Sequence, residues 1–385
     1  MLCNKNECTG CFSCFNACPK GAIEMKEDKC GFIYPAINKE KCINCKLCEK
    51  SCPVLNKIEL NKPQKCYAGR VKDSQELKKA TSGGIATKLS QKIIENNGVV
   101  YGASFEENCT VSHIRVDNKE ELDKLRGSKY VHSYINNTYK LVKKDLNEGK
   151  NVLFIGTPCQ VAGLKQYLFN EYKNLYTVDI ICHGVPSQKF LQNEVKRIEK
   201  DLNIDRVNFR DKRYKEYTFS IIKNNKEVFN EGLIKSPYLC SFMASIICRE
   251  NCYNCRYATS ERCADLTIGD FWGLDKSSKF YSDMEKGISV LLPCTTKGIE
   301  LINSIQDSIE LEERQIDEAV DGNAQLKHVV PQNKKAKEFR ERYNGDFYVT
   351  YRNVMKFEYY KQKLKSNRII RWIWKIKKGI FNGEK

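Results

Sequence analysis

The feature that most limits how this chain folds is a cysteine run that occurs twice near its start. Each run has the form C-x-x-C-x-x-C-x-x-x-C-P, and the two copies begin at Cys8 and Cys42. Three cysteines at this spacing bind one four-iron cluster, and the fourth cysteine of each run binds the other cluster when two are present. The spacing therefore predicts two [4Fe-4S] clusters with crossed ligands. The two predicted ligand sets are Cys8, Cys11, Cys14 and Cys52, and Cys42, Cys45, Cys48 and Cys18.

Residues 1–55 resemble a two-cluster bacterial ferredoxin throughout, with strand-like segments at 21–24 and 31–35 between the runs. Structural zinc is one alternative, but zinc sites use C-x-x-C pairs set well apart. Disulfides are the other alternative, and they are typical of secreted chains. No charged segment followed by an apolar segment precedes Cys3, so we expect a reducing, cytoplasmic location.

A chain of 385 residues predicts two or three domains. No apolar stretch approaches the roughly 18 residues of a membrane-spanning helix, so we expect a protein that is soluble or at most peripheral. The formal net charge is +17, and residues 353–385 hold ten Lys or Arg against two Glu. Without a helix-turn-helix, zinc-finger or RNP-like pattern, this charge does not favour nucleic acid. An acidic electron-carrier protein is the partner that fits it better.

The first informative segment after the head is A-T-S-G-G-I-A-T at residues 80–87, followed by an amphipathic run and a strand-like segment at 98–102. A Ser-Gly-Gly turn that opens a helix leaves backbone N–H groups unpaired, and such groups can bind a phosphate. A plain helix cap explains the same residues. The segment alone therefore leaves both interpretations open.

Two later segments share the pattern of a strand, a cysteine and a helix. An apolar strand at 151–155 and a Thr-Pro pair precede Cys159, which we expect in the first turn of a helix. A second strand at 176–181 leads to Cys182. Both cysteines are then expected at the carboxyl edge of one sheet, where open α/β sheets bind ligands. A helix start is expected to lower the pKa of Cys159, although a buried structural role explains either cysteine alone.

A further cysteine group follows a stretch, residues 205–232, that alternates like a hairpin or a meander around an Asn-Asn turn. Its members are Cys248, Cys252, Cys255 and Cys263. Zinc held by four cysteines competes here with an iron-sulfur site.

Taken together, several segments resemble the beta subunit of the coenzyme F420 hydrogenase and dehydrogenase family, from residue 1 to about residue 310. Beside the head, the matching segments are TSGG at 81–84, RGSKY at 126–130, GTPCQ at 156–160, CHG at 182–184, C-x-x-C at 252–255 and D-x-x-x-GDFWG at 265–273. The resemblance implies a flavoprotein that holds FAD and a third [4Fe-4S] cluster in its large domain. It also implies electron transfer between a carrier and a substrate.

The same resemblance implies specific residues for the two large-domain cofactors. The third cluster would be bound by Cys159, Cys182, Cys252 and Cys255. Cys248 and Cys263 are additional, and with Cys252 and Cys255 they form an alternative, local ligand set. The expected FAD-binding residues are Ser82, Gly83, Gly84, Lys129 and Asp270.

We therefore expect an α+β ferredoxin-like head at residues 1–58 and a larger α/β flavoprotein domain at 64–350. The expected function is that of an iron-sulfur flavoprotein oxidoreductase, which passes electrons between a carrier such as ferredoxin or a deazaflavin and a small substrate. The alternative is a non-catalytic electron-transfer subunit of a larger complex. Residues 351–385 form a basic amphipathic tail, which is expected either to pack on its own domain or to contact the inner face of a membrane.

Overall fold

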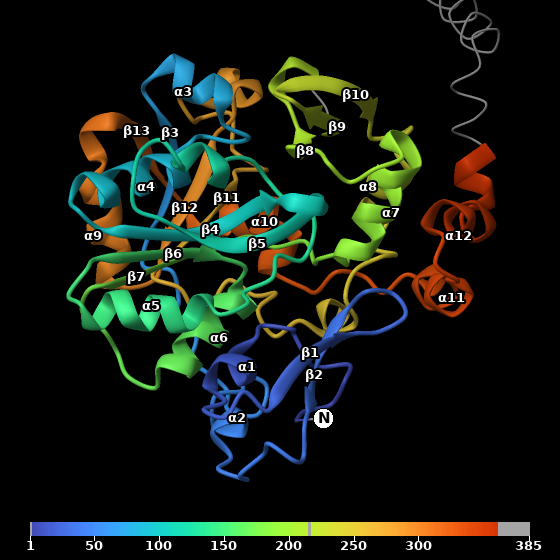
Figure 1. The fold of residues 1–385 in the computed structure, drawn as a ribbon. Helices are drawn as coiled ribbons and strands as arrows, with labels where there is room; N and C mark the ends of the chain where they lie inside the picture. Colours follow the sequence, from blue (N-terminus) through green and yellow to red (C-terminus); the bar gives the residue numbers. More distant parts are fainter. Residues whose placement is uncertain (1, 215–216, 361–385) are drawn as a thin grey trace, which may run out of the picture.

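The computed structural model describes residues 2–214 and 217–360, and an eight-stranded mixed sheet lies at its centre (Figure 1). The inner strands β11, β7, β6 and β4 are parallel, and the strands on either side of them pair antiparallel. From edge to edge the order is β13 (Ile309–Arg314), β3 (Cys66–Val71), β12 (Ser289–Pro293), β11 (Leu266–Asp270), β7 (Leu175–Ile180), β6 (Val152–Gly156), β4 (Val99–Glu106) and β5 (Thr110–Val116).

Helices cover both faces of this sheet. Val99 of β4 packs in a core with α5 and α6, whereas the next residue, Val100, packs in a second core with α4 and α9. The parallel strands are apolar on both faces because both faces are covered. The covering helices are α4 (Ile85–Glu95), α5 (Thr138–Asn147), α6 (Pro158–Leu168) and α9 (Thr296–Ser304). The predicted mixed α/β character of the large domain is confirmed.

A second, smaller sheet lies beside the first one (Figure 1). It is an antiparallel meander, as the alternation of residues 205–232 predicted, and its hairpin turns at Asn224 and Asn225, which both have positive φ. Asparagine tolerates this left-handed conformation better than most residues. Its strands are β8 (Arg206–Arg210), β9 (Tyr217–Lys223) and β10 (Lys226–Gly232).

An aromatic core joins this meander to four helices. Phe209, Phe219, Tyr238 and Phe347 are all nearly fully buried in it. The helices are α7 (Gln188–Glu199), α8 (Pro237–Met243), α11 (Lys334–Arg342) and α12 (Phe347–Val354). Two short helices, α3 (Ser74–Lys79) and α10 (Ile316–Gly322), complete the large domain.

The head forms the lower end of the molecule in Figure 1. It consists of an antiparallel hairpin with two short helices beside it. The elements are α1 (Ser13–Ala17), β1 (Ile23–Glu27), β2 (Ile33–Ile37) and α2 (Leu47–Lys50). The segment that leaves the head pairs with the large domain, because Asn61 and Arg262 form an isolated antiparallel bridge.

The expected boundary between residues 350 and 351 falls inside α12, which continues to Val354. The part of the expected basic amphipathic tail from residue 361 onward lies outside the described residues. None of the helices that the structure describes combines the length and the apolar character needed to cross a lipid bilayer.

Candidate functional site

Two small cavities in the head divide its eight motif cysteines into two groups of four. The first cavity is lined by Cys8, Cys11, Cys14 and Cys52, which we call the inner set. The second is lined by Cys18, Cys42, Cys45 and Cys48, which we call the outer set. The structure thus brings together the two crossed sets that the spacing predicted.

The duplication of the cysteine run is also visible in the backbone. Gly10 and Phe12 have φ of 66° and 62°, and the residues 34 positions later, Asn44 and Lys46, have φ of 54° and 59°. Phe12 and Lys46 then serve as the N-caps of α1 and α2. Left-handed residues in such turns can direct backbone N–H groups toward an enclosed anion. Each copy of the run therefore folds in the same way around its own cavity.

The inner set lies against the large domain through α6. A Cβ atom at Gly163 would be 2.9 Å from Cβ of Cys11 and 3.0 Å from its Sγ. Gly163 lies one helical turn beyond Cys159. The same helix therefore contacts the inner set and begins at the site expected for the third cluster, which we call the third site. The outer set is more open, because Cys45 is exposed whereas Cys8, Cys11 and Cys52 are buried.

The surroundings of the buried Arg249 indicate whether the inner set suits an iron-sulfur cluster. Arg249 is 0% exposed, and it donates hydrogen bonds of 2.8 Å to the carbonyl oxygens of Cys8 and Ile33. Its guanidinium lies 4.3 Å from the centre of the Tyr34 ring. Within the described residues it has no carboxylate partner, and its Nη1 atom has no hydrogen-bond partner. A buried cation needs a counter-charge. A thiolate-bound cluster is an anion that would supply it, so the residues fit the cluster.

The third site forms where two strand ends meet a short turn. Cys159 lies in the first turn of α6, as predicted, and Cys182 follows β7. Cys252 lies in the 3-10 turn Glu250–Asn254, and Cys255 comes directly after it. Burial raises the pKa of Cys182 well above its ordinary value, and the neighbouring thiols of Cys252, Cys159 and Cys255 raise it further. The four thiols that the resemblance implied are therefore close enough to affect one another electrostatically.

One detail of the Cys159 prediction is wrong. The helix start was expected to lower the pKa of this thiol, but burial raises it to about 12. The hydroxyl of Thr157, 3.2 Å from Sγ, acts in the opposite direction without reversing the shift. Removal from water therefore outweighs the helix start for the thiol by itself. A metal bound to the sulfur would favour the thiolate at this position.

The two additional cysteines, Cys248 and Cys263, lie in different hydrophobic cores. Cys248 and Cys252 belong to the aromatic core, whereas Cys263 is in the core under α6 and lies 3.3 Å from the carbonyl oxygen of Pro158. Across residues 2–214 and 217–360, no three Cys, His, Asp or Glu side chains are placed to hold a metal ion. Four-iron clusters separate their thiolates more widely than a single zinc ion does, because each thiolate binds a different iron atom.

A cavity of about 310 Å³ opens at the carboxyl ends of the parallel strands. Its wall includes Gly156 at the end of β6, Ile180 at the end of β7 and Asp270 at the end of β11. Cys182 and His183 also line it. The cavity therefore extends from the third site across the sheet edge where α/β proteins bind ligands.

Four of the five residues expected to bind FAD line this cavity: Ser82, Gly84, Lys129 and Asp270. Gly84 has φ of +81° and begins α4 without a side-chain cap, so the first N–H groups of that helix remain available for an anion. Gly83 is not among the lining residues. Its N–H donates to Ser289 Oγ over 3.0 Å, and its carbonyl accepts from the N–H of Val71 over 2.8 Å, so it anchors the loop to the sheet.

Lys129 and Asp270 are already engaged in the cavity wall. Lys129 Nζ donates to the carbonyl oxygens of Leu125 and Arg126 over 2.9 and 2.8 Å, and burial lowers its pKa to about 7. Asp270 accepts a 2.5 Å hydrogen bond from Arg210. Arg210 lies on β8, far from any motif, and no sequence signal connected it with the cavity. It is the clearest residue that sequence reasoning missed.

A buried polar network explains the glutamine of the GTPCQ segment. The side-chain oxygen of Gln160 accepts from the N–H of Thr157 over 3.0 Å, and its amide nitrogen donates to the carbonyl of Ser133 over 3.0 Å. Ser133 Oγ is in turn 3.1 Å from Nδ1 of His113, whose pKa burial lowers to about 4. A neutral His113 with its proton on Nε2 donates to the Ile155 carbonyl over 3.0 Å. This network fixes the start of α6, and with it Cys159.

Three family models match this chain. A model described as coenzyme F420 hydrogenase/dehydrogenase, beta subunit N-term, matches residues 66–140, and the model for the C terminus of the same subunit matches residues 149–319. The chain belongs to the coenzyme F420 hydrogenase/dehydrogenase beta subunit family. A 4Fe-4S dicluster domain model matches residues 7–56 of this family member. An iron-sulfur electron-transfer function follows from these three matches together.

Two curated relatives are similar to different parts of this family member. The coenzyme F420-dependent sulfite reductase of Methanocaldococcus jannaschii is 24% identical over 328 residues, which is 80% of this chain and 47% of the relative. The chain therefore spans about half the length of that relative. An uncharacterised ferredoxin of the same organism is 36% identical over 66 residues, which is 17% of this chain and 84% of the ferredoxin.

Among solved structures, a chain of the F420-reducing [NiFe] hydrogenase complex from Methanosarcina barkeri is similar to this family member. It is 20% identical, and the match covers 74% of this chain and 93% of that one with a TM-score of 0.47.

Proposed function

We propose that the chain is an iron-sulfur flavoprotein oxidoreductase that transfers electrons between a carrier, either a ferredoxin-type protein or a deazaflavin, and a small substrate. FAD would bind in the 310 Å³ cavity, and [4Fe-4S] clusters would bind at the inner set, the outer set and the third site. When bound, the flavin would exchange single electrons with the clusters and electron pairs with the substrate. Residues 1–58 and 64–350 are the domains proposed for these cofactors.

The observation that carries the proposal is that one cavity reaches both an uncapped helix start and a third-site cysteine. Gly84, at the start of α4, and Cys182, after the end of β7, line the same cavity. Around Gly84, the free N–H groups of α4 would hold a phosphate group. Around Cys182, the wall is formed by His183 and by the pair Arg210 and Asp270, which offer polar contacts to an isoalloxazine ring or a substrate.

In this scheme the chain's own residues orient the groups and exclude water. Lys129 holds the turn that closes the cavity on one side, through its bonds to Leu125 and Arg126. The buried, neutral His113 holds the end of β6 on another side. Hydrogen bonds within the chain therefore hold both walls in place.

Replacing Gly84 with aspartate is expected to weaken flavin binding at least about tenfold, which is about 1.4 kcal/mol. The new carboxylate would lie at the helix start where the phosphate should bind, and like charges repel there. Gly84→Asn is the matched control, because it has nearly the same volume and a similar tolerance of positive φ. Flavin content per chain, measured after anaerobic purification, tests the prediction. Equal flavin loss in both variants would show that crowding against Val71, and not charge, is responsible.

Cysteine substitutions separate the two ligand sets of the third site. We expect about twelve iron atoms per wild-type chain, from three four-iron clusters. Cys182→Ser should lower the iron content by up to about four atoms, whereas Cys263→Ser should leave it unchanged. Iron, sulfide and zinc quantification measures both results. Loss of iron only in the Cys263 variant would favour the local set of Cys248, Cys252, Cys255 and Cys263, and zinc without iron would refute all of the clusters.

A second candidate is a non-catalytic electron-transfer subunit of a larger complex. It is favoured by the length of the sulfite reductase relative, of which this chain covers 47%. The two candidates differ in turnover: the first predicts substrate reduction by the chain with a reduced carrier, and the second predicts none without a partner chain.

A further inference from the structure

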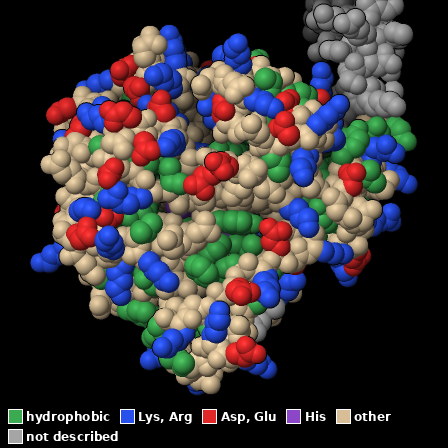
Figure 2. Space-filling model, in the orientation of Figure 1, with side chains coloured by type: hydrophobic (Ala, Val, Ile, Leu, Met, Phe, Trp, Pro, Cys, Tyr) green, Lys and Arg blue, Asp and Glu red, His purple; other side chains and the backbone are tan. Residues whose placement is uncertain are grey.

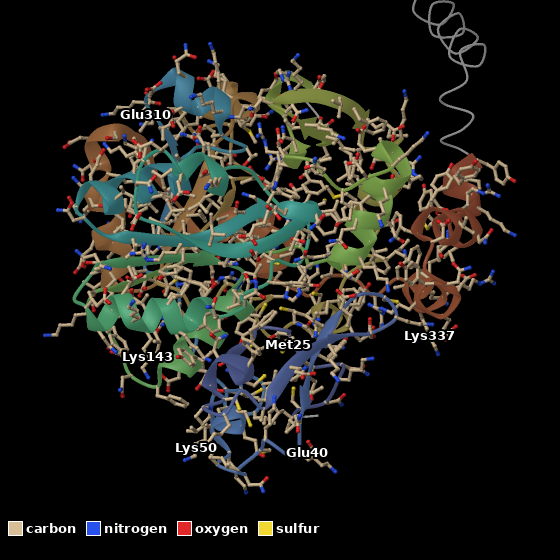
Figure 3. All side chains as sticks on the ribbon, in the orientation of Figure 1. Met25, Glu40, Lys50, Lys143, Glu310 and Lys337 are labelled. Atoms are coloured by element: carbon tan, nitrogen blue, oxygen red, sulfur yellow. The ribbon has the colours of Figure 1, made fainter. Side chains whose placement is uncertain are left out.

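The two cysteine sets of the head differ in what surrounds them. The inner set is covered by α6 and by the buried Arg249, whereas the outer set lies at the opposite end of the head. Figure 3 shows Lys50 and Glu40 at this end, which is the part of the head farthest from the large domain. Cys45 is exposed here, and Ile43 beside it is 56% exposed. Of the two head sites, this is the one within reach of a second protein.

Five exposed lysines surround the outer set, and we call this surface the lysine tip. They are Lys20, Lys39, Lys41, Lys46 and Lys50. The acidic residues among them are Glu40 and Glu49, so the surface has a clear positive excess. Figure 2 shows Lys and Arg side chains around this lower end, with fewer acidic ones.

The lysines of the tip are not neutralised by ion pairs. Within the part of the chain that the structure describes, none of the five lies within ion-pair distance of a carboxylate, although Glu40 and Glu49 are close in sequence. Elsewhere on the surface such pairs are common, as between Lys119 and Glu95 or Lys335 and Glu358, both at 2.9 Å. Because no paired carboxylate offsets their positive charge, these lysines can attract an anionic surface at long range.

We propose that the lysine tip is the docking site of an acidic electron-carrier protein, whose own cluster donates one electron to the outer cluster. The inference rests on the proposed function. The step is a one-electron exchange: the carrier's [4Fe-4S] cluster goes from the 1+ to the 2+ state, the outer cluster goes from 2+ to 1+, and no atom or proton is transferred. Exposed Ile43 gives the interface an apolar centre inside a ring of charge, an arrangement suited to a small, transient complex.

The proposal gives the three cluster sites an order. An electron would enter at the exposed outer set and continue to the inner set. Cys18 and Cys52 connect the two sets, because each belongs to one cysteine run and to the cluster of the other run. It would then reach the third site through α6, where Gly163 contacts Cys11 one turn after Cys159. The surface entry point and the cavity of the large domain are thus at opposite ends of one path.

The test uses the holoprotein and an acidic two-cluster bacterial ferredoxin as the probe. The variant Lys39→Glu, Lys41→Glu, Lys50→Glu reverses three charges at the tip without changing a cysteine or the N-cap residue Lys46. We expect both its second-order rate of reduction by the reduced ferredoxin and its affinity for the oxidised ferredoxin to fall about ten- to a hundredfold at low salt. The difference from wild type should shrink between 0.01 and 0.15 M salt, as the Debye length falls from about 30 to about 8 Å.

The matched control reverses three exposed lysines away from the tip: Lys196→Glu, Lys276→Glu and Lys334→Glu. Net charge changes equally in both variants, so equal losses would overturn the docking site in favour of a general charge effect. Equal rates for the tip variant and wild type would also overturn it. Binding of the wild-type tip to anionic phospholipid vesicles, with no affinity for the ferredoxin, would replace the protein partner with a membrane.

Two further measurements separate failure of this inference from failure of the proposed function. Reduction by dithionite, which needs no docking, should bleach the head clusters equally in wild type and both variants. Absence of clusters from wild type would refute the proposed function itself. Intact clusters with a salt-independent ferredoxin rate would refute only the docking site.

Discussion

Replacing Arg249 with methionine is expected to detach the head from the large domain and to lower the free energy of unfolding by about 2–5 kcal/mol. The carbonyl oxygens of Cys8 and Ile33 would lose their only described side-chain donor, and each unsatisfied buried acceptor costs about 1–3 kcal/mol. The inner set would also lose the buried cation that donates to the backbone of Cys8. Denaturant unfolding, followed by the cluster absorbance, measures the shift in midpoint.

The control for this prediction is Arg256→Met. Arg256 also bridges the two domains, through a 2.7 Å bond to the carbonyl oxygen of Ile58, but it is exposed. Loss of an exposed bond of this kind is expected to cost less than about 0.5 kcal/mol. Arg249→Lys should be intermediate, because an ammonium keeps the charge without the planar set of donors. An unchanged midpoint for Arg249→Met would mean that the arginine does not hold the head in place.

The parts of this fold that were predictable from sequence are those set by local spacing. The crossed cysteine sets follow from a repeat of 34 residues, and the same repeat appears in the positive φ of Phe12 and Lys46. The position of Cys159 follows from a strand that ends just before a Thr-Pro pair, since proline is favoured at a helix start. In each case the signal is a fixed spacing or a short run of residues that can be read directly from the sequence.

The features that sequence patterns did not predict depend on burial and on contacts between distant segments. The pKa of Cys159 rises because the folded chain removes it from water, which no local pattern records. Gly83 faces the sheet and not the cavity because Ser289, about two hundred residues later, accepts its N–H. Arg249 and Arg210 are single arginines without a motif. Their roles appear only when the head meets the large domain and when β8 approaches β11.

Gly163 in α6 is another residue whose role depends on contacts between distant segments. A glycine inside a helix costs roughly 0.5–1 kcal/mol relative to alanine, so its presence in α6 needs a packing reason. The reason is close approach: a Cβ atom would be 2.9 Å from both Cβ of Cys11 and the hydroxyl of Tyr139. Neither neighbour moves easily, because Tyr139 is fully buried and donates a 2.7 Å hydrogen bond to the Gln160 carbonyl.

Gly163→Val is therefore expected to push α6 away from the inner set. Overpacking of this kind costs about 1–3 kcal/mol. We also expect slower electron transfer from the head to the large domain, because the helix that joins the inner set to Cys159 is displaced. Gly163→Ala should give a smaller effect of the same sign, since its methyl group meets the same atoms with less volume.

After rapid mixing with dithionite, the reduction of the head clusters and of the proposed flavin can be recorded separately. The electron paramagnetic resonance signals of the two head clusters provide an internal control. The inner-cluster signal should change in Gly163→Val, whereas the outer-cluster signal should not, because Gly163 contacts Cys11 and none of the outer cysteines. Identical changes in both signals would point to general destabilisation of the head. Unchanged signals together with an unchanged flavin rate would show that the contact between α6 and Cys11 has no part in electron transfer.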